Sequence, residues 1–75
     1  MHVSVEAIKA IKPGRIEAIP CAKEKMRSAA TVMSDMKRFN NLPEGVVEYE
    51  HKKFPELGII LVRPLREGDT KVLNI

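Results

Sequence analysis

The segment from Ala22 to Phe39 constrains the fold most, because it is the longest part of the chain with one clear periodicity. Its apolar residues recur at the i, i+3, i+4, i+7 spacing of an amphipathic helix, and they are Ala22, Met26, Ala29, Ala30, Met33 and Met36. A helix with one apolar face needs another element to remove that face from water. The sequence therefore predicts a main helix over 22–39 that packs on the rest of a small domain.

Shorter elements are expected before this helix. Met1–Lys12 has a short helical pattern, with Ser4 as a candidate N-cap whose hydroxyl accepts a bond from a free backbone N–H. The dipeptide Pro13-Gly14 ends this pattern. Residues Arg15–Ile19 alternate between apolar and charged side chains, which fits a short strand or an extended connector, and we favour the strand.

A β-hairpin is expected after the main helix. The alternation in Val46–Phe54 predicts a half-exposed strand, with Glu48, Glu50 and Lys52 on its exposed side. The turn Pro55–Gly58 then leads to Ile59–Val62, a continuous apolar run typical of a buried or central strand.

The last part of the chain is less regular. Pro64 is expected to end the apolar run. Residues Lys71–Ile75 fit either a final short strand or a tail that docks on a partner.

Together these elements predict one α+β domain over residues 1–75. We expect its core to contain Ile16, Met26, Ala29, Ala30, Met33, Met36, Tyr49, Ile60 and Val62. A chain of 75 residues buries only about 60% of its unfolded surface, and this one has four Met and only three aromatic residues. Small domains with marginal cores often gain stability by association, so we expect a homodimer.

Several functional classes find no support in the residues. A single cysteine, Cys21, permits no intramolecular disulfide and fits a reducing, cytoplasmic setting. No apolar run approaches the ~20 residues of a membrane span. The histidines His2 and His51 lack the partners of a metal site, and the carboxylates Glu48 and Glu50 have no apolar pocket that would suit acid–base work. We therefore expect a non-catalytic protein without a cofactor.

The candidate binding residues follow a second stripe on the main helix. They are the cations and hydroxyls Lys23, Arg27, Thr31, Ser34 and Arg38, which are groups that contact nucleic-acid phosphates. Residues 1–45 hold eight Lys or Arg against five Asp or Glu, whereas residues 46–75 hold five of each, so the whole net charge of +3 lies with the helical part. The alternative is an ordinary solvated face, since Glu24 and Asp35 also lie on the outer side.

The chain also resembles small phage-encoded helix-plus-hairpin proteins of mostly unknown function. The pieces that match are Ile19-Pro20, Arg27-Ser28-Ala29-Ala30 and Val62-Arg63, within residues 15–65. The residues 52–58 and the extension after Leu65 depart from that pattern. The resemblance implies a phage or mobile-element origin, the host cytoplasm, and a nucleic-acid or host-factor role, without naming catalytic residues.

Two functional hypotheses follow. The first is a small nucleic-acid-binding protein that uses the second stripe of the main helix. The second is a protein-interaction module, either a phage inhibitor of a host factor or a dimeric accessory subunit. It would use the Met-rich edge of the helix or the exposed strand, because methionine side chains adapt to partners and open strands accept another strand.

Overall fold

The computed structural model describes residues 4–73, and it confirms the predicted α+β class. The elements in chain order are helix α1 (Val5–Lys9), strand β1 (Glu17–Pro20), the 3-10 turn η1 (Lys23–Lys25), helix α2 (Met26–Arg38), strand β2 (Glu48–Phe54) and strand β3 (Ile59–Leu65). The strands form one antiparallel sheet in the order β1-β3-β2. The apolar run beginning at Ile59 is therefore the central strand, as predicted.

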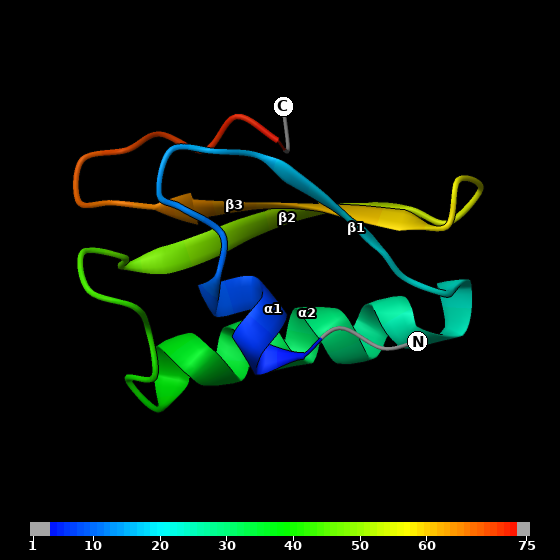
Figure 1. The fold of residues 1–75 in the computed structure, drawn as a ribbon, viewed down its shortest axis with the longest axis horizontal. Helices are drawn as coiled ribbons and strands as arrows, with labels where there is room; N and C mark the ends of the chain where they lie inside the picture. Colours follow the sequence, from blue (N-terminus) through cyan, green and yellow to red (C-terminus); the bar gives the residue numbers. More distant parts are fainter. Residues whose placement is uncertain (1–3, 74–75) are drawn as a thin grey trace.

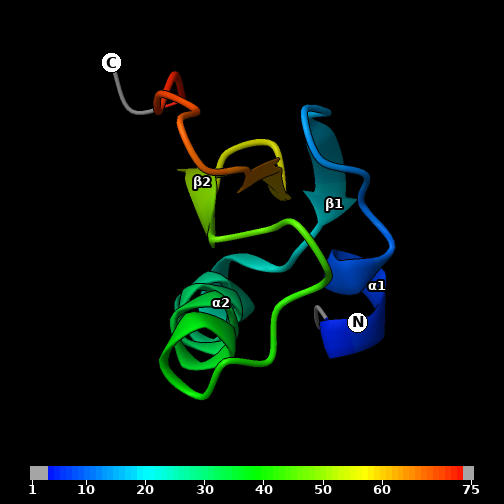
Figure 2. The ribbon, with the colours of Figure 1, turned by 90° about the vertical axis from the view of Figure 1, so that its left-hand side faces the viewer.

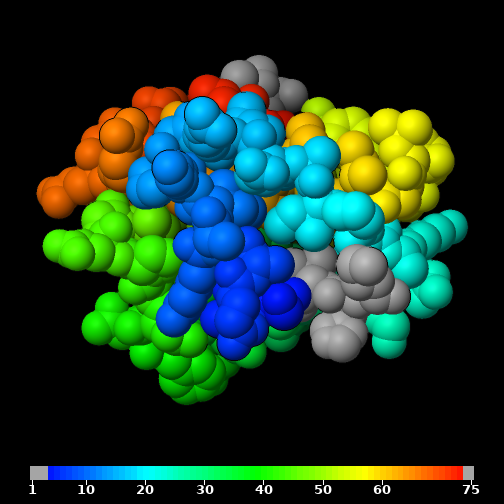
Figure 3. Space-filling model, in the orientation of Figure 1, coloured from blue at the N-terminus to red at the C-terminus, as the bar shows by residue number. Residues whose placement is uncertain are grey.

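The molecule has two layers. Both helices lie on one side of the sheet, and the segment after β3 lies on the other side (Figure 1). Seen end-on, α2 lies beneath β2 and α1 lies towards β1 (Figure 2). In the space-filling view, α1 and the connection from α1 to β1 cover the middle of the face turned towards the viewer (Figure 3). Within residues 4–73, no other helix or strand covers the outer side of α2.

Local sequence signals explain where the helices begin and end. The Ser4 hydroxyl caps α1 by accepting a hydrogen bond of 3.1 Å from the Ala7 N–H, as predicted. Helix α2 ends because Asn40 takes a left-handed conformation with φ 55°, which lets the Asn41 N–H donate to the Met36 carbonyl at 2.7 Å. This is the Schellman arrangement, and asparagine is among the few residues that adopt it at low cost.

The prediction that Pro64 ends the apolar run is wrong, because β3 continues to Leu65. Proline is tolerated in a strand only where no ladder bond needs its N–H. The Cys21 N–H donates to the Gly58 carbonyl at 2.8 Å, so Gly58 directs its backbone groups towards β1. Every second residue along an antiparallel strand has the same orientation, so Ile60 and Val62 also direct their backbone groups towards β1. Pro64 has the same orientation. However, β1 begins at Glu17, which pairs with Val62, so β1 does not extend as far as Pro64. In the described part of the sheet, no partner strand lies on that side of Pro64.

The predicted core is largely confirmed. The residues Met26, Ala29, Met33, Met36, Tyr49, Ile60 and Val62 are all buried, together with Ile8, Ile11, Cys21 and Val46. Ala30 is only half-buried. The prediction for Ile16 is wrong, since this side chain is 50% exposed. Ile19 pairs with Ile60 and packs on the core instead, and Ile16 lies one residue before β1 begins.

Candidate nucleic-acid interface

The five predicted binding residues lie along the outer side of η1 and α2. Within α2 they follow the i, i+4, i+7, i+11 spacing of one helix face, opposite the face that holds the buried methionines. All are exposed, and we call them the basic stripe: Lys23, Arg27, Thr31, Ser34 and Arg38. The structure therefore places the whole set on one surface that solvent can reach.

The side chains of the basic stripe differ in how free they are. Among the residues described, Lys23, Arg27 and Arg38 form no salt bridge. The Arg38 guanidinium lies 5.3 Å from the centre of the Phe39 ring, which orients it without neutralising its charge. The Thr31 hydroxyl donates to the Arg27 carbonyl at 3.0 Å, so Thr31 offers a ligand an acceptor rather than a donor.

The two acidic residues near the basic stripe do not cancel its charge equally. Asp35 is half-buried and lines an apolar groove between α1 and α2, together with Val5, Val32, Met36, Phe39 and Asn41. Glu24 is exposed, beside Lys23 and Lys25 in η1. Of these two carboxylates, Glu24 is the one freely exposed next to the stripe.

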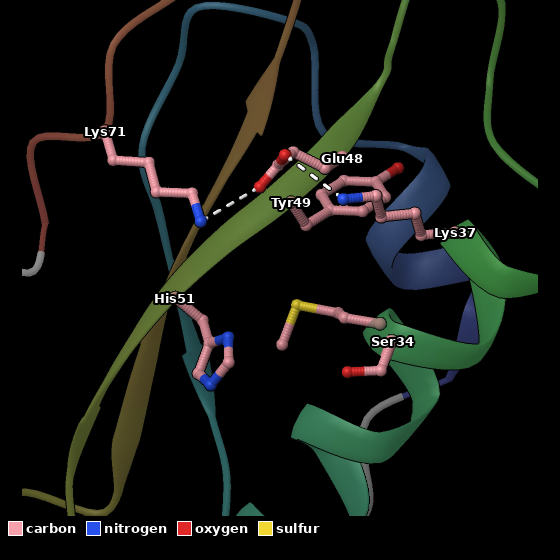
Figure 4. Close-up of a pocket in the computed structure, with 7 residues that line it drawn as sticks. Ser34, Lys37, Glu48, Tyr49, His51 and Lys71 are labelled. Carbon is pink, nitrogen blue, oxygen red and sulfur yellow. Dashed lines mark hydrogen bonds and ion pairs between the residues drawn. The ribbon is translucent and has the colours of Figure 1, made fainter.

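A second charged cluster adjoins the stripe, and the sequence alone did not predict it. It surrounds a pocket of about 210 Å³ between α2 and β2, lined by Met33, Ser34, Lys37, Glu48, Tyr49, His51 and Lys71 (Figure 4). Glu48 accepts from Lys37 at 3.3 Å and from Lys71 at 3.1 Å. One carboxylate thus faces two ammonium groups, which leaves this rim positive.

The pKa shifts in the pocket keep Glu48 ionised and Tyr49 protonated at neutral pH. The hydrogen bond from Lys71 lowers the pKa of Glu48 most, and the hydrogen bond and charge of Lys37 lower it further. Burial acts in the opposite direction, but the pKa of Glu48 stays below its usual range. Burial raises the pKa of the Tyr49 hydroxyl, so it stays protonated. The pocket presents ammonium groups and the Ser34 hydroxyl, which suit an anionic oxygen.

His51 lies at the wall of this pocket on the side of β2. Burial and then the charge of Lys53 lower its pKa below the ordinary 6.5. The imidazole is therefore neutral at pH 7 in the folded protein. It adds no positive charge to the surface under neutral conditions.

This shift gives a prediction about pH and stability. The unfolded chain binds a proton at His51 more readily than the folded one, so stability should fall as pH falls through 6.5 towards the lower folded pKa. The pKa of Glu48 lies below its usual range, so this neighbouring carboxylate stays ionised as His51 titrates. We expect His51→Gln to lose less stability than the wild type between pH 7.5 and pH 5 in urea titrations. Identical pH dependence of the two proteins would contradict the burial of a neutral imidazole.

The structure also corrects the prediction that Glu50 is an exposed residue of the hairpin. Its side chain is fully buried, and Arg63 Nη1 donates to it at 3.1 Å. The backbone N–H of Val72 donates to the same carboxylate at 3.0 Å, and that of Leu73 at 3.5 Å. The segment after β3 therefore folds back over β2 and covers Glu50. Through Leu73 it forms no strand, and residues 74 and 75 lie outside the described part.

Comparisons with known proteins place the chain in no family. No protein-family model, curated protein or solved structure matches it significantly. No helix in residues 4–73 is both long and apolar enough to cross a membrane. Within the same residues, no group of three or more His, Cys, Asp or Glu side chains is placed to hold a metal ion.

Proposed function

We propose that this chain is a small non-catalytic nucleic-acid-binding protein that contacts the phosphate backbone through the basic stripe. The observation that carries the proposal is the exposure of three cations, Lys23, Arg27 and Arg38, on the uncovered side of η1 and α2 without salt bridges among the described residues. The resemblance to phage-encoded proteins remains a separate prediction about origin.

The dimensions of the stripe suit a nucleic-acid groove. At a rise of 1.5 Å per residue, Arg27 and Arg38 are about 16 Å apart along the helix axis. The major groove of B-form DNA is about 12 Å wide and admits an α-helix. Cations at the two ends of α2 can therefore reach phosphates on opposite sides of such a groove. Lys37 and Lys71 extend the positive surface beyond the stripe.

The proposal predicts a salt dependence. Each phosphate contact on duplex DNA should add about −0.9 to the slope of log affinity against log salt, so the three cations of one copy give about −2.7. Arg27→Ala should flatten this slope by about 0.9 and leave the fold intact, because Arg27 is exposed. Fluorescence anisotropy with duplex and single-stranded oligonucleotides at several salt concentrations measures the slope.

A matched variant controls for total charge. Arg15 is exposed and lies before β1, away from α2, so Arg15→Ala removes one cation without altering the stripe. We expect its slope to equal that of the wild type. Equal flattening by both variants would indicate a diffuse charge effect, and the absence of binding to any oligonucleotide at low salt would refute the proposal.

A protein-interaction module is the second candidate, and two observations favour it. Phe39 is 69% exposed beside the apolar groove between α1 and α2, and β2 has no neighbour on its outer edge within the described sheet. The Met-rich side of α2 is not available, because Met26, Met33 and Met36 are buried. A pull-down from host lysate, carried out with and without nuclease, separates the two candidates. Recovery of nucleic acid only in the absence of nuclease favours the nucleic-acid-binding protein. Recovery of a protein partner that resists nuclease favours the protein-interaction module.

A further inference from the structure

The outer edge of β2 is an open strand edge surrounded by positive charge. We propose that it binds the acidic carboxyl-terminal end of an extended peptide, which adds to the sheet as a further strand antiparallel to β2. The last residue of the peptide faces His51, and its carboxylate lies beside Lys37 and Lys71. The argument rests on backbone orientation and charge, and it does not depend on nucleic-acid binding by the basic stripe.

The backbone of β2 presents a row of unpaired groups along this edge. Since Ile60 and Val62 direct their backbone groups towards β1, the residues between them on β3 direct theirs towards β2. The residues that pair with them on β2 alternate along the strand, and they are Glu48, Glu50, Lys52 and Phe54. The N–H and C=O groups of Tyr49, His51 and Lys53 therefore point outwards, where no strand within residues 4–73 meets them. Alternating donors and acceptors match another strand, whereas a phosphate backbone offers acceptors.

The position of α2 suits a lone strand rather than a second copy of this chain. Helix α2 lies beneath β2, in the other layer of the molecule (Figure 2). A strand added beside β2 lies about 4.8 Å from it in the plane of the sheet, above the layer of α2. A second copy paired through β2 would bring a second α2 into the space of the first. An extended peptide carries no helix, so the edge accepts it without this overlap.

Positive charge surrounds the exposed part of the edge. Lys52 and Lys53 are exposed, and among the described residues neither forms a salt bridge. The carboxylate of Glu50 does not offset them, because it is fully buried against Arg63. In the proposed register the penultimate residue of the peptide faces Lys52. An acidic side chain at that position therefore forms a cross-strand ion pair.

The ion pairs at Glu48 determine the direction of the peptide. Lys37 and Lys71 bond to Glu48 from opposite sides of β2, at 3.3 Å and 3.1 Å, and all three line the pocket beside Tyr49 (Figure 4). Each ammonium group has three donors, and both lysine side chains are more than half exposed, so donors remain for a second carboxylate. A carboxyl terminus is attracted to this end of β2 and an amino terminus is repelled, which selects the antiparallel direction.

The pocket between α2 and β2 accepts the last side chain of the peptide. Residues directly opposite each other in a sheet place their side chains on the same face. The side chain opposite His51 therefore enters the pocket of about 210 Å³ that His51 lines together with Met33 and Ser34. Met33 contributes an apolar wall, so a small aliphatic residue such as valine suits the last position.

Methylated peptides test the strand pairing. The probe is fluorescein-labelled Gly-Ser-Thr-Val-Thr-Asp-Val with a free carboxylate, titrated with the protein in fluorescence anisotropy. Methylation of the last amide nitrogen removes the N–H that donates to the His51 carbonyl, and we expect roughly tenfold weaker binding. The matched control carries the methyl group on the preceding amide, whose N–H points away from β2, and it should bind as the parent peptide does. Amidation of the carboxyl terminus should weaken binding about fivefold.

Changes in the protein test the same register. Lys52→Glu should weaken binding about fivefold, because repulsion of the penultimate aspartate replaces attraction. Lys12→Glu is the control, since Lys12 is exposed and lies before β1, and it should leave the affinity unchanged. Saturating peptide should slow hydrogen exchange at the His51 and Lys53 amides but not at the Lys52 amide, which is directed towards β3.

Three outcomes would overturn the proposal. The first is no binding of the probe at millimolar protein. The second is an equal loss of affinity from the two methylated peptides, which would indicate attraction by charge without strand pairing. The third is equal affinity for the amidated and free-acid peptides, which would place the carboxyl terminus away from Lys37 and Lys71.

Discussion

Met33→Ala is expected to lower the free energy of unfolding by about 2–5 kcal/mol. Met33 lies in the middle of α2 and is only 3% exposed, in the cluster that includes Tyr49 and Ile60. Truncation removes apolar contacts and leaves a cavity, which surrounding side chains fill only in part. Small domains have total stabilities of roughly 5–15 kcal/mol, so this loss is a large share. Urea denaturation followed by circular dichroism measures it.

Met33→Lys should be more damaging, because it places an unpaired ammonium group among apolar side chains. The matched control is Leu57→Ala, at a turn position that is 65% exposed, where we expect a change within about 0.5 kcal/mol. Equal urea midpoints for Met33→Ala and Leu57→Ala would show that α2 does not present Met33 to the core.

Short-range patterns predicted much of the fold. The helical period in 22–39 identified α2 and its buried methionines, and Ser4 marked the start of α1 because an N-cap acts within a few residues of its own position. The alternation after Val46 and the apolar run from Ile59 predicted the hairpin. These features depend on local backbone preferences and on which face of an element is apolar.

The errors concern residues whose environment is set by distant parts of the chain. Pro64 remains in a strand because β1 begins opposite Val62 and does not reach the proline. The residues around Pro64 give no sign of where β1 begins. Glu50 is buried because Arg63 and the backbone of Val72 converge on it from beyond the turn. Ile16 is exposed because β1 begins one residue later. In each case the deciding contact joins segments that are far apart in sequence or sets an exact strand boundary.

The same distinction applies to the candidate site. The basic stripe was predictable because helical spacing alone places its residues on one face. The pocket with Lys37, Glu48 and Lys71 was not, because it requires α2, β2 and the last segment to meet. Glu48 and Glu50 lie two residues apart in an alternating strand, so the sequence pattern assigns both to the same environment. It does not reveal that Glu50 is buried and that Glu48 bridges Lys37 and Lys71.

Arg63→Met should lower the free energy of unfolding by about 3–5 kcal/mol, the usual cost of removing one partner from a buried ion pair. The Glu50 side chain is completely buried and that of Arg63 is only 15% exposed. Without the guanidinium, the donors left to Glu50 among residues 4–73 are the N–H groups of Val72 and Leu73. Arg63 Nη1 also donates to the Thr70 carbonyl at 3.0 Å, so the variant loses a direct tether of the last segment.

Two measurements identify the cause of this loss. Hydrogen exchange at the Val72 amide should accelerate in Arg63→Met, because the carboxylate that accepts its bond is no longer held in place. The double variant Glu50→Gln with Arg63→Met should lose less stability than the sum of the two single variants, because both changes remove the same interaction. The control Arg66→Met removes an equal charge from the exposed pair with Asp69, where solvent screens the attraction and a much smaller change is expected. Additive losses in the double variant, with Val72 exchange unchanged, would mean that the ion pair does not hold the last segment against the sheet.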